Sequence, residues 1–357
     1  MTPSDARRRQ IVQWLTDELA FPVLKLEPAS ADASFRRYFR VWHRNGTTRV
    51  VMDAPPDKED IGAFLEVGAL LERCGVHVPH VDAADKLRGL VLLEDLGSTP
   101  YLSQLRAAAD PDVLYAQALQ ALLRIQTAPR ELAQQLPPYD RAALERELAL
   151  MPEWFCARHL RLNLDDEERG MLAHSFEFLS SEALAQPVVF VHRDYHSRNL
   201  MFLPHDNPGI IDFQDALAGP VGYDLVSLLK DCYIDWPRAR VERWVGEYRS
   251  LLMRIAGPAG PAGASEREFL RWFDLIGLQR HIKVLGVFSR LWYRDAKSGY
   301  LPDLPRTLAY VRDAAGRFDE LRAFADWLER RVLARFAAAN QRSLAEAAAL
   351  ERSAGGM

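Results

Sequence analysis

The chain has 357 residues, of which 48% are hydrophobic and 26% are charged, and its formal net charge is −4. This length exceeds that of one ordinary core and predicts two lobes, while the composition is typical of a soluble globular protein. The negative charge gives no general attraction to nucleic acid, and no apolar run approaches the roughly 20 residues of a membrane span. Neither a nucleic acid nor a membrane is therefore expected as a partner.

Three widely separated cysteines, Cys74, Cys156 and Cys232, show no C-x-x-C spacing. They predict neither a disulfide framework nor a zinc site, and they fit a reducing, cytoplasmic location. Near the N-terminus, residues 11–19 combine polar with apolar side chains. This mixture predicts an amphipathic helix rather than a signal-peptide core.

A β-rich stretch is predicted next, with strands over residues 23–26, 38–42 and 49–52. Asn45-Gly46 favours a hairpin between the last two strands, because both residues tolerate positive φ. The connection over residues 28–35 is rich in small side chains and contains no glycine. We expect a loop there.

The next two elements are a predicted helix over residues 59–74 and a predicted buried strand over residues 90–93, which runs into an acidic turn ending at Gly97. From Tyr101 the apolar spacing is mainly helical. The expected division is therefore a β-rich lobe over residues 1–97 and a larger, helical lobe over residues 98–357. Helices are predicted in the second lobe over residues 112–126, 140–159, 165–183, 275–293 and 334–350.

Two short apolar runs, residues 188–191 and 209–211, are predicted strands that end in polar residues. The first leads into His192-Arg193-Asp194-Tyr195-His196-Ser197-Arg198-Asn199, and the second leads into Asp212-Phe213. A lone Asp or His at a strand end is usually a cap or a turn former. The combination H-R-D-x-x-x-x-N followed by apolar-apolar-Asp-Phe is instead the phosphoryl-transfer set of kinases.

This chemistry explains the residue types. Asp194 suits the carboxylate that orients an acceptor hydroxyl and takes its proton, whereas Asn199 and Asp212 offer the oxygen ligands that Mg²⁺ prefers beside ATP phosphates. His192 is expected to support the loop by hydrogen bonding. Gln214 stands where such a set usually has glycine after Asp-Phe.

A kinase-type site assigns nucleotide-binding roles to the first lobe. Ser34 and Phe35 lie in the small-residue loop that would close over the phosphates, and the backbone from Glu94 to Leu96 would face the adenine, unless this segment is simply a strand end. Met52 occupies the third-strand position where a phosphate-binding lysine is usual. Either Mg²⁺ and a nearby cation, Lys58 or Arg36, replace that lysine, or the protein binds nucleotide without catalysis.

The sequence resembles the aminoglycoside-phosphotransferase-like, or kinase-like, small-molecule kinases. Within that family it is similar to the cell-wall-recycling subgroup, which phosphorylates N-acetylmuramate and N-acetylglucosamine at the anomeric hydroxyl. The resemblance implies a bilobal α+β protein-kinase-like fold, ATP with Mg²⁺, and a sugar 1-phosphate that a separate nucleotidyltransferase consumes. It is carried by residues 34–40, 50–56, 192–195, 212–216 and 279–284.

The same resemblance places Tyr195 and Gln214 among the sugar-binding residues. In the helix predicted over residues 275–293, Arg280 and Lys283 fall on one basic stripe. We predict that one of these two cations reads the lactyl carboxylate that N-acetylmuramate has and N-acetylglucosamine lacks. Arg290 and Arg294, further along the stripe, fit a solvated face.

Alternatives remain open at this stage. Another small-molecule phosphotransferase, acting on an aminoglycoside or amino alcohol, would need an acidic pocket for its cationic substrate. A nucleotide-binding pseudokinase is disfavoured by intact Asp194, Asn199 and Asp212, and a protein kinase by the lack of a following Ala-Pro-Glu signature. Asp224, just before a predicted helix, either caps that helix or braces the catalytic loop.

Overall fold

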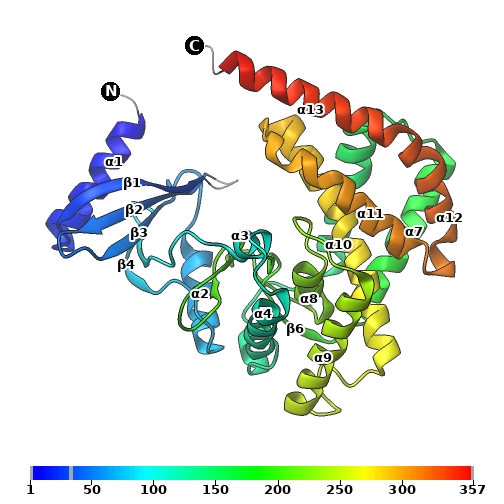
Figure 1. The fold of residues 1–357 in the computed structure, drawn as a ribbon, viewed down its shortest axis with the longest axis horizontal. Helices are drawn as coiled ribbons and strands as arrows, with labels where there is room; N and C mark the ends of the chain where they lie inside the picture. The colour runs from blue at the N-terminus through cyan, green and yellow to red at the C-terminus, as the bar shows by residue number, and fades with distance from the viewer. Residues whose placement is uncertain (1–2, 32–34, 355–357) are drawn as a thin grey trace. The chain divides into compact units, whose positions relative to one another are not determined.

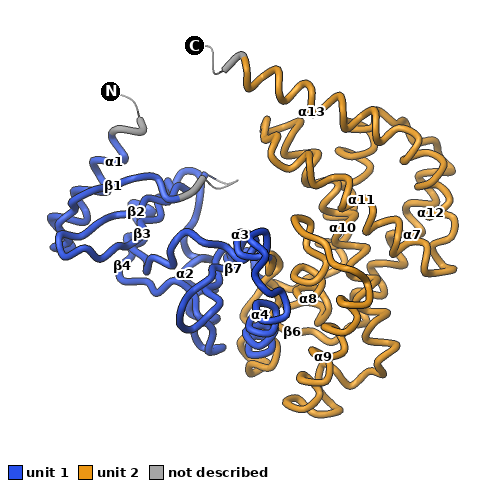
Figure 2. Tube along the Cα trace, viewed as in Figure 1, with its two compact units in different colours: residues 1–125, 197–216 blue, residues 126–196, 217–357 orange. Residues whose placement is uncertain are grey.

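The computed structural model describes residues 3–31 and 35–354, and Figure 1 shows the course of the chain. The chain forms two compact units, coloured in Figure 2: residues 1–125 with 197–216, and residues 126–196 with 217–357. The sequence placed the division after residue 97. The first unit continues beyond that point because segment 197–216 is tied to the residues after Gly97, with Leu102 N donating to Ser197 O at 2.9 Å and Phe202 N donating to Thr99 O at 2.8 Å.

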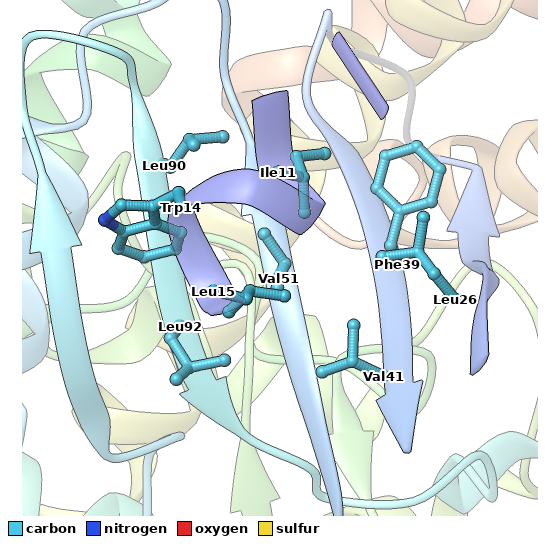
Figure 3. Packing of buried hydrophobic residues seen from close by; sticks show 9 residues of the cluster. All are labelled: Ile11, Trp14, Leu15, Leu26, Phe39, Val41, Val51, Leu90 and Leu92. Atoms are coloured by element: carbon cyan, nitrogen blue, oxygen red, sulfur yellow. The ribbon is translucent and has the colours of Figure 1, made fainter. Parts of the chain in front are cut away.

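A five-stranded antiparallel sheet dominates the first unit. Its order is β1-β2-β3-β5-β4, and its strands are β1 (Val23–Ala31), β2 (Arg37–His43), β3 (Thr48–Asp53), β4 (Val81–Asp85) and β5 (Leu90–Glu94). Helix α1 (Pro3–Gln13) and the π-helical turn Trp14–Glu18 pack on one face. Figure 3 shows this core, in which Ile11, Trp14 and Leu15 meet strand residues such as Val51.

The sheet agrees with the predicted strands but differs in two places. β1 continues to Ala31, through residues expected to form a loop, and it contains Pro28, which is tolerated in an edge strand. β4 has no counterpart in the sequence prediction. Its sequence, VDAAD, contains few strong strand formers, and its pairing with β5 is what makes it a strand.

Outside the sheet, the first unit contains a contact between Phe213 and helix α2. Phe213 is buried and stacks on Phe64 of α2, with ring centroids 4.9 Å apart. Gly68, also on α2, lies close to this ring, since an added Cβ would lie 3.3 Å from Phe213 Cε2. The remaining elements are α2 (Gly62–Arg73), α3 (Tyr101–Arg106), α4 (Pro111–Gln126), β7 (Leu200–Met201) and β8 (Gly209–Ile210).

The second unit is mainly helical and is built around the long helix α10 (Glu266–Asp295). Gly286 lets the π-helical segment Met151–His159 cross α10 closely, because an added Cβ would lie 2.5 Å from the Leu150 Cβ. The other α-helices and strands are α5 (Arg130–Ala133), α6 (Arg141–Leu148), α7 (Asp166–Leu184), β6 (Val188–Val191), β9 (Leu217–Pro220), α8 (Gly222–Leu229), α9 (Arg238–Ala256), α11 (Leu304–Ala315), α12 (Arg322–Trp327) and α13 (Ala334–Ala354). Two short 3-10 helices, Ser298–Asp303 and Asp319–Leu321, and a π-helical segment, Leu328–Leu333, complete the unit.

The predicted helices of this unit are present, but the one predicted over residues 275–293 is α10, which already begins at Glu266. Helix α7 begins after Asp165, which forms a capping box with Glu168. The helix predicted over residues 140–159 is divided into α6 and the π-helical segment that contains Pro152. Within the residues that the structure describes, no helix is long and apolar enough to cross a membrane.

Candidate active site

The catalytic loop begins where β6 ends, and Asp224 of α8 holds its backbone. One Asp224 carboxylate oxygen accepts His192 N at 2.6 Å and the other accepts Arg193 N at 2.9 Å. Arg193 has φ +80°, a conformation that costs free energy for a side chain other than glycine and persists only when its surroundings fix it. Of the two roles left open for Asp224, the structure shows the brace, since the N-cap of α8 is Val221.

The ionisation of Asp194, two residues beyond the start of the loop, is influenced by several cations and by the neighbouring Asp224 carboxyl group. Burial opposes its ionisation, but the charges of Lys283, His196, Arg280 and Arg193 together hold the pKa of Asp194 below its ordinary value. By contrast, burial raises the pKa of Asp224 to about 7. At neutral pH Asp194 is therefore an ionised carboxylate, as a base that accepts a hydroxyl proton must be.

Glu147, at the end of α6, joins two of these cations. Its Oε1 accepts Arg193 Nη2 at 2.6 Å and lies 3.0 Å from Lys283 Nζ, while its Oε2 accepts the Tyr139 hydroxyl and Gln279 Nε2. Burial penalises its charge, but Lys283 and Arg193 lower the pKa of Glu147 to about 2. The carboxylate is thus fully ionised and saturated with donors.

Lys283 and Arg280 of α10, the cations predicted to read the lactyl carboxylate, have different neighbours. Lys283 also donates to the Tyr223 hydroxyl at 3.1 Å. Arg280 is 4% exposed, and its Nη1 lies 3.7 Å from Cys232 Sγ. Both contribute to the low pKa of Asp194, so the structure brings these two predicted residues into the electrostatic environment of the predicted base.

Tyr195 is fully buried in the described conformation, and its ring packs edge-on against His192 with centroids 5.7 Å apart. The role of Tyr195 in binding sugar stays a prediction, and in this structure its ring lies beside the catalytic-loop residue His192. His192 contributes as expected, because its Nδ1 lies 3.3 Å from Asp194 N.

The predicted metal ligands lie in the first unit, where β7 pairs with β8 in antiparallel register. Ile211 N donates to Asn199 O at 3.0 Å, and Asn199 Nδ2 lies 3.1 Å from Asp212 Oδ2. Gln214 Nε2 donates to the other Asp212 oxygen at 2.8 Å. The role of Gln214 in binding sugar stays a prediction, and in this structure its side-chain nitrogen is bonded to Asp212.

This donor set fits Mg²⁺. Asn199 supplies an amide oxygen and Asp212 two carboxylate oxygens, which are the hard ligands that Mg²⁺ takes, and the two side chains lie within hydrogen-bond distance of each other. No group of three or more His, Cys, Asp or Glu side chains suited to a metal occurs in the described ranges 3–31 and 35–354. A carboxylate, an amide and ATP phosphates are what a kinase uses instead.

The predicted nucleotide-binding residues lie on and beside the sheet. Ser34 falls outside the described residues. Phe35 is 65% exposed, and Lys58 Nζ lies 6.0 Å from the centre of its ring. Met52 is fully buried on β3, so it presents no surface to a ligand in this conformation. The Lys58 ammonium group therefore lies near Phe35. Lys58 is one of the two cations expected to replace the missing third-strand lysine.

The turn after β5 is held by an ion pair that the sequence did not predict. Arg40 of β2 donates Nε to Asp95 Oδ2 at 2.6 Å and Nη2 to Asp95 Oδ1 at 2.9 Å, and it also donates to Gly97 O. Next to Asp95, Leu96 is buried and the Glu94 carboxylate pairs with His77 at 3.1 Å. The predicted adenine-facing backbone is therefore a fixed turn.

A comparison of the sequence with protein families gives a match to the phosphotransferase enzyme family over residues 25–273. The chain belongs to this family. A relative from Pseudomonas putida named N-acetylmuramate/N-acetylglucosamine kinase is 44% identical over 90% of this chain and 95% of its own length. A relative of the same name from Neisseria meningitidis is 42% identical over 88% of this chain and 93% of its own length.

Solved phosphotransferase structures share the fold. The GDP complex of aminoglycoside 2′-phosphotransferase-IIIa has a TM-score of 0.57 at 18% identity, covering 87% of this chain and 99% of that one. An ethanolamine kinase from Plasmodium vivax has a TM-score of 0.57 at 12% identity, covering 80% of this chain and 82% of that one. The bilobal α+β, kinase-like fold class predicted from the sequence is confirmed.

Proposed function

We propose that this phosphotransferase moves the γ-phosphoryl group of ATP to the anomeric hydroxyl of N-acetylmuramate or N-acetylglucosamine. The observation that supports the proposal is the set of cations Arg193, Arg280 and Lys283 that act on Asp194, two of which are partly balanced by Glu147. Such a site suits an acceptor that is neutral or anionic and opposes a cationic one. The names of the relatives agree with this choice of acceptor.

In the proposed reaction the sugar hydroxyl is oriented by the Asp194 carboxylate and gives it a proton. The sugar oxygen forms a bond to the γ-phosphorus, and the bond from that phosphorus to the β–γ bridging oxygen breaks to release ADP. Asn199 Oδ1 and Asp212 would hold Mg²⁺, which supplies neutralisation of phosphate charge. The brace by Asp224 keeps the base in place without touching the substrate.

For the nucleotide we propose Ser34, Phe35 and the backbone from Glu94 to Leu96. Lys58 is proposed as the cation that takes over the role of the absent third-strand lysine, supported by its position beside Phe35. We also propose that the protein works in the cytoplasm and that a nucleotidyltransferase consumes its sugar 1-phosphate. Such an enzyme would use the phosphate as its nucleophile.

The test is an ADP-release assay with MgATP and a panel of acceptors. Both N-acetylated amino sugars should be phosphorylated, whereas a cationic aminoglycoside and ethanolamine should give background rates. Turnover of the cationic acceptors alone would contradict the proposal. Nucleotide binding without turnover of any acceptor would identify a pseudokinase.

A further inference from the structure

The proposed reaction assigns no role to the side chain of Glu147. It is a buried, ionised carboxylate whose partners are two of the cations around Asp194. One of its oxygens contacts both Arg193 and Lys283, at 2.6 and 3.0 Å. A charge buried in this way is held by its partners and in turn partly cancels their fields.

The negative charge of Glu147 offsets part of the positive charge near Asp194. Arg193, Arg280 and Lys283 contribute positive charge, and Asp194 itself is needed as the base. Among the described residues, Glu147 is the carboxylate that makes a direct ion pair with Lys283. Without its charge, the electrostatic potential at the acceptor would be more positive, and any anionic acceptor would gain relative to a neutral one.

The carboxylate is also fixed in place. Tyr139 donates its hydroxyl to Glu147 Oε2, and Gln279 Nε2 lies 3.1 Å from the Tyr139 oxygen and 3.3 Å from Glu147 Oε2. These bonds leave the other oxygen turned to Arg193 and Lys283. The orientation of the Glu147 carboxylate is therefore set by Tyr139 and Gln279 as well as by the two cations.

We propose that Glu147 is a specificity-determining residue, whose negative charge moderates Lys283 and Arg193 so that the site accepts a neutral amino sugar as well as an anionic one. The inference rests on the proposed function. It assigns to Glu147 the balance between N-acetylglucosamine, which is neutral, and N-acetylmuramate, which carries a lactyl carboxylate. Glu147 acts through the two cations and is not a catalytic residue.

The experiment compares kcat/KM for the two sugars in the full chain with MgATP. In Glu147→Gln, which keeps the shape and removes the charge, the ratio of N-acetylmuramate to N-acetylglucosamine should rise roughly threefold or more. Glu147→Asp is the matched control, because it shortens the side chain and keeps the charge. Its ratio should stay within about twofold of wild type even if both rates fall.

Loss of a buried counter-charge threatens folding, so a second pair of variants is included. Lys283→Met is compared with Glu147→Gln/Lys283→Met, in which both members of the ion pair are neutral. The ratio should again be higher in the variant that lacks the Glu147 charge. An unchanged or lower ratio in the folded variants, with both sugars still phosphorylated, overturns the role of Glu147, whereas failure of the wild-type protein to phosphorylate either sugar overturns the proposed function itself.

Discussion

The side-chain nitrogen of Asn199 lies 3.1 Å from an Asp212 carboxylate oxygen, which fixes the orientation of both side chains. The bond holds the Asn199 amide beside the Asp212 carboxylate, and both groups are oxygen ligands that suit a hard cation. Gln214 holds the second Asp212 oxygen at 2.8 Å. Two metal-ligand candidates are thus oriented by contacts within one short segment.

We predict that Asn199→Ala and Asp212→Ala each raise the Mg²⁺ concentration for half-maximal ATP turnover by about tenfold or more, because each removes an oxygen ligand from a hard cation. A Mg²⁺ titration at fixed ATP measures this. Asp206→Asn is the control, since Asp206 is exposed in the same segment and asparagine tolerates its φ of +49°. Unchanged Mg²⁺ dependence in both alanine variants would disprove the metal assignment.

Asp194→Asn should lower kcat by roughly 10²–10⁴-fold, because an amide cannot accept the hydroxyl proton. Nucleotide affinity should change little, since Asp194 is not assigned to the metal or the phosphates. Steady-state kinetics and calorimetric titration with ADP give the two quantities. A kcat within threefold of wild type would remove Asp194 from the role of base.

Arg40→Ala should lower the free energy of unfolding by about 1–3 kcal/mol and raise KM for ATP, because Arg40 fixes the turn proposed to face adenine. Arg49→Ala removes a more exposed ion pair, with Asp82, from the same sheet and should cost less than about 1 kcal/mol. Urea denaturation and kinetics compare the two. Equal effects on KM would show that the turn after β5 has no special part in nucleotide binding.

The Arg40 pair also predicts a pH dependence. Burial opposes ionisation of Asp95, but hydrogen bonds from Arg40, Thr48 and the Gly97 backbone outweigh it and hold the pKa of Asp95 below its ordinary 3.8. Because the folded-state pKa of Asp95 lies below its unfolded-state value, the ionised carboxylate stabilises the fold at neutral pH. This stabilisation is lost as the pH falls through the folded-state pKa. The stability difference between wild type and Asp95→Asn should therefore be larger at pH 7 than at pH 3.

Arg280→Ala and Lys283→Ala test which cation reads the lactyl group. A charge-assisted hydrogen bond to a carboxylate contributes roughly 1.5–3 kcal/mol, so one of the two variants should lose about tenfold or more in kcat/KM for N-acetylmuramate and less for N-acetylglucosamine. Arg294→Ala, at an exposed position that pairs with Asp295, should have little effect. Equal losses on both sugars would assign the cations to nucleotide binding or to the fold.

The residues proposed for catalysis and metal binding are those whose signal is local in the chain. Asp194, Asn199 and Asp212 were identifiable because their spacing between two apolar runs is itself the signal. Glu147 carries no such signal, since it contacts Arg193 across 46 positions and its helix has an ordinary amphipathic pattern. Its role depends on tertiary packing, which neither propensity nor periodicity encodes.

The secondary structure was likewise predicted where its pattern is local and missed where it depends on contacts distant in the sequence. Strongly patterned strands such as β2 and β3 were predicted within a residue or two, whereas β4 was missed because its weak strand formers depend on β5 for pairing. The division between compact units could not be read from the helical spacing after Tyr101. It depends on hydrogen bonds such as that between Leu102 and Ser197, which are distant in sequence.

The position of the new phosphate on the sugar tests the central claim most directly. After incubation of the protein with MgATP and N-acetylglucosamine or N-acetylmuramate, phosphorus NMR distinguishes a sugar 1-phosphate from a 6-phosphate by its coupling to the attached proton or protons. We predict the 1-phosphate of both sugars, formed by wild type and lost in Asp194→Asn. A 6-phosphate, or a protein that binds MgATP and phosphorylates neither sugar, would contradict the account.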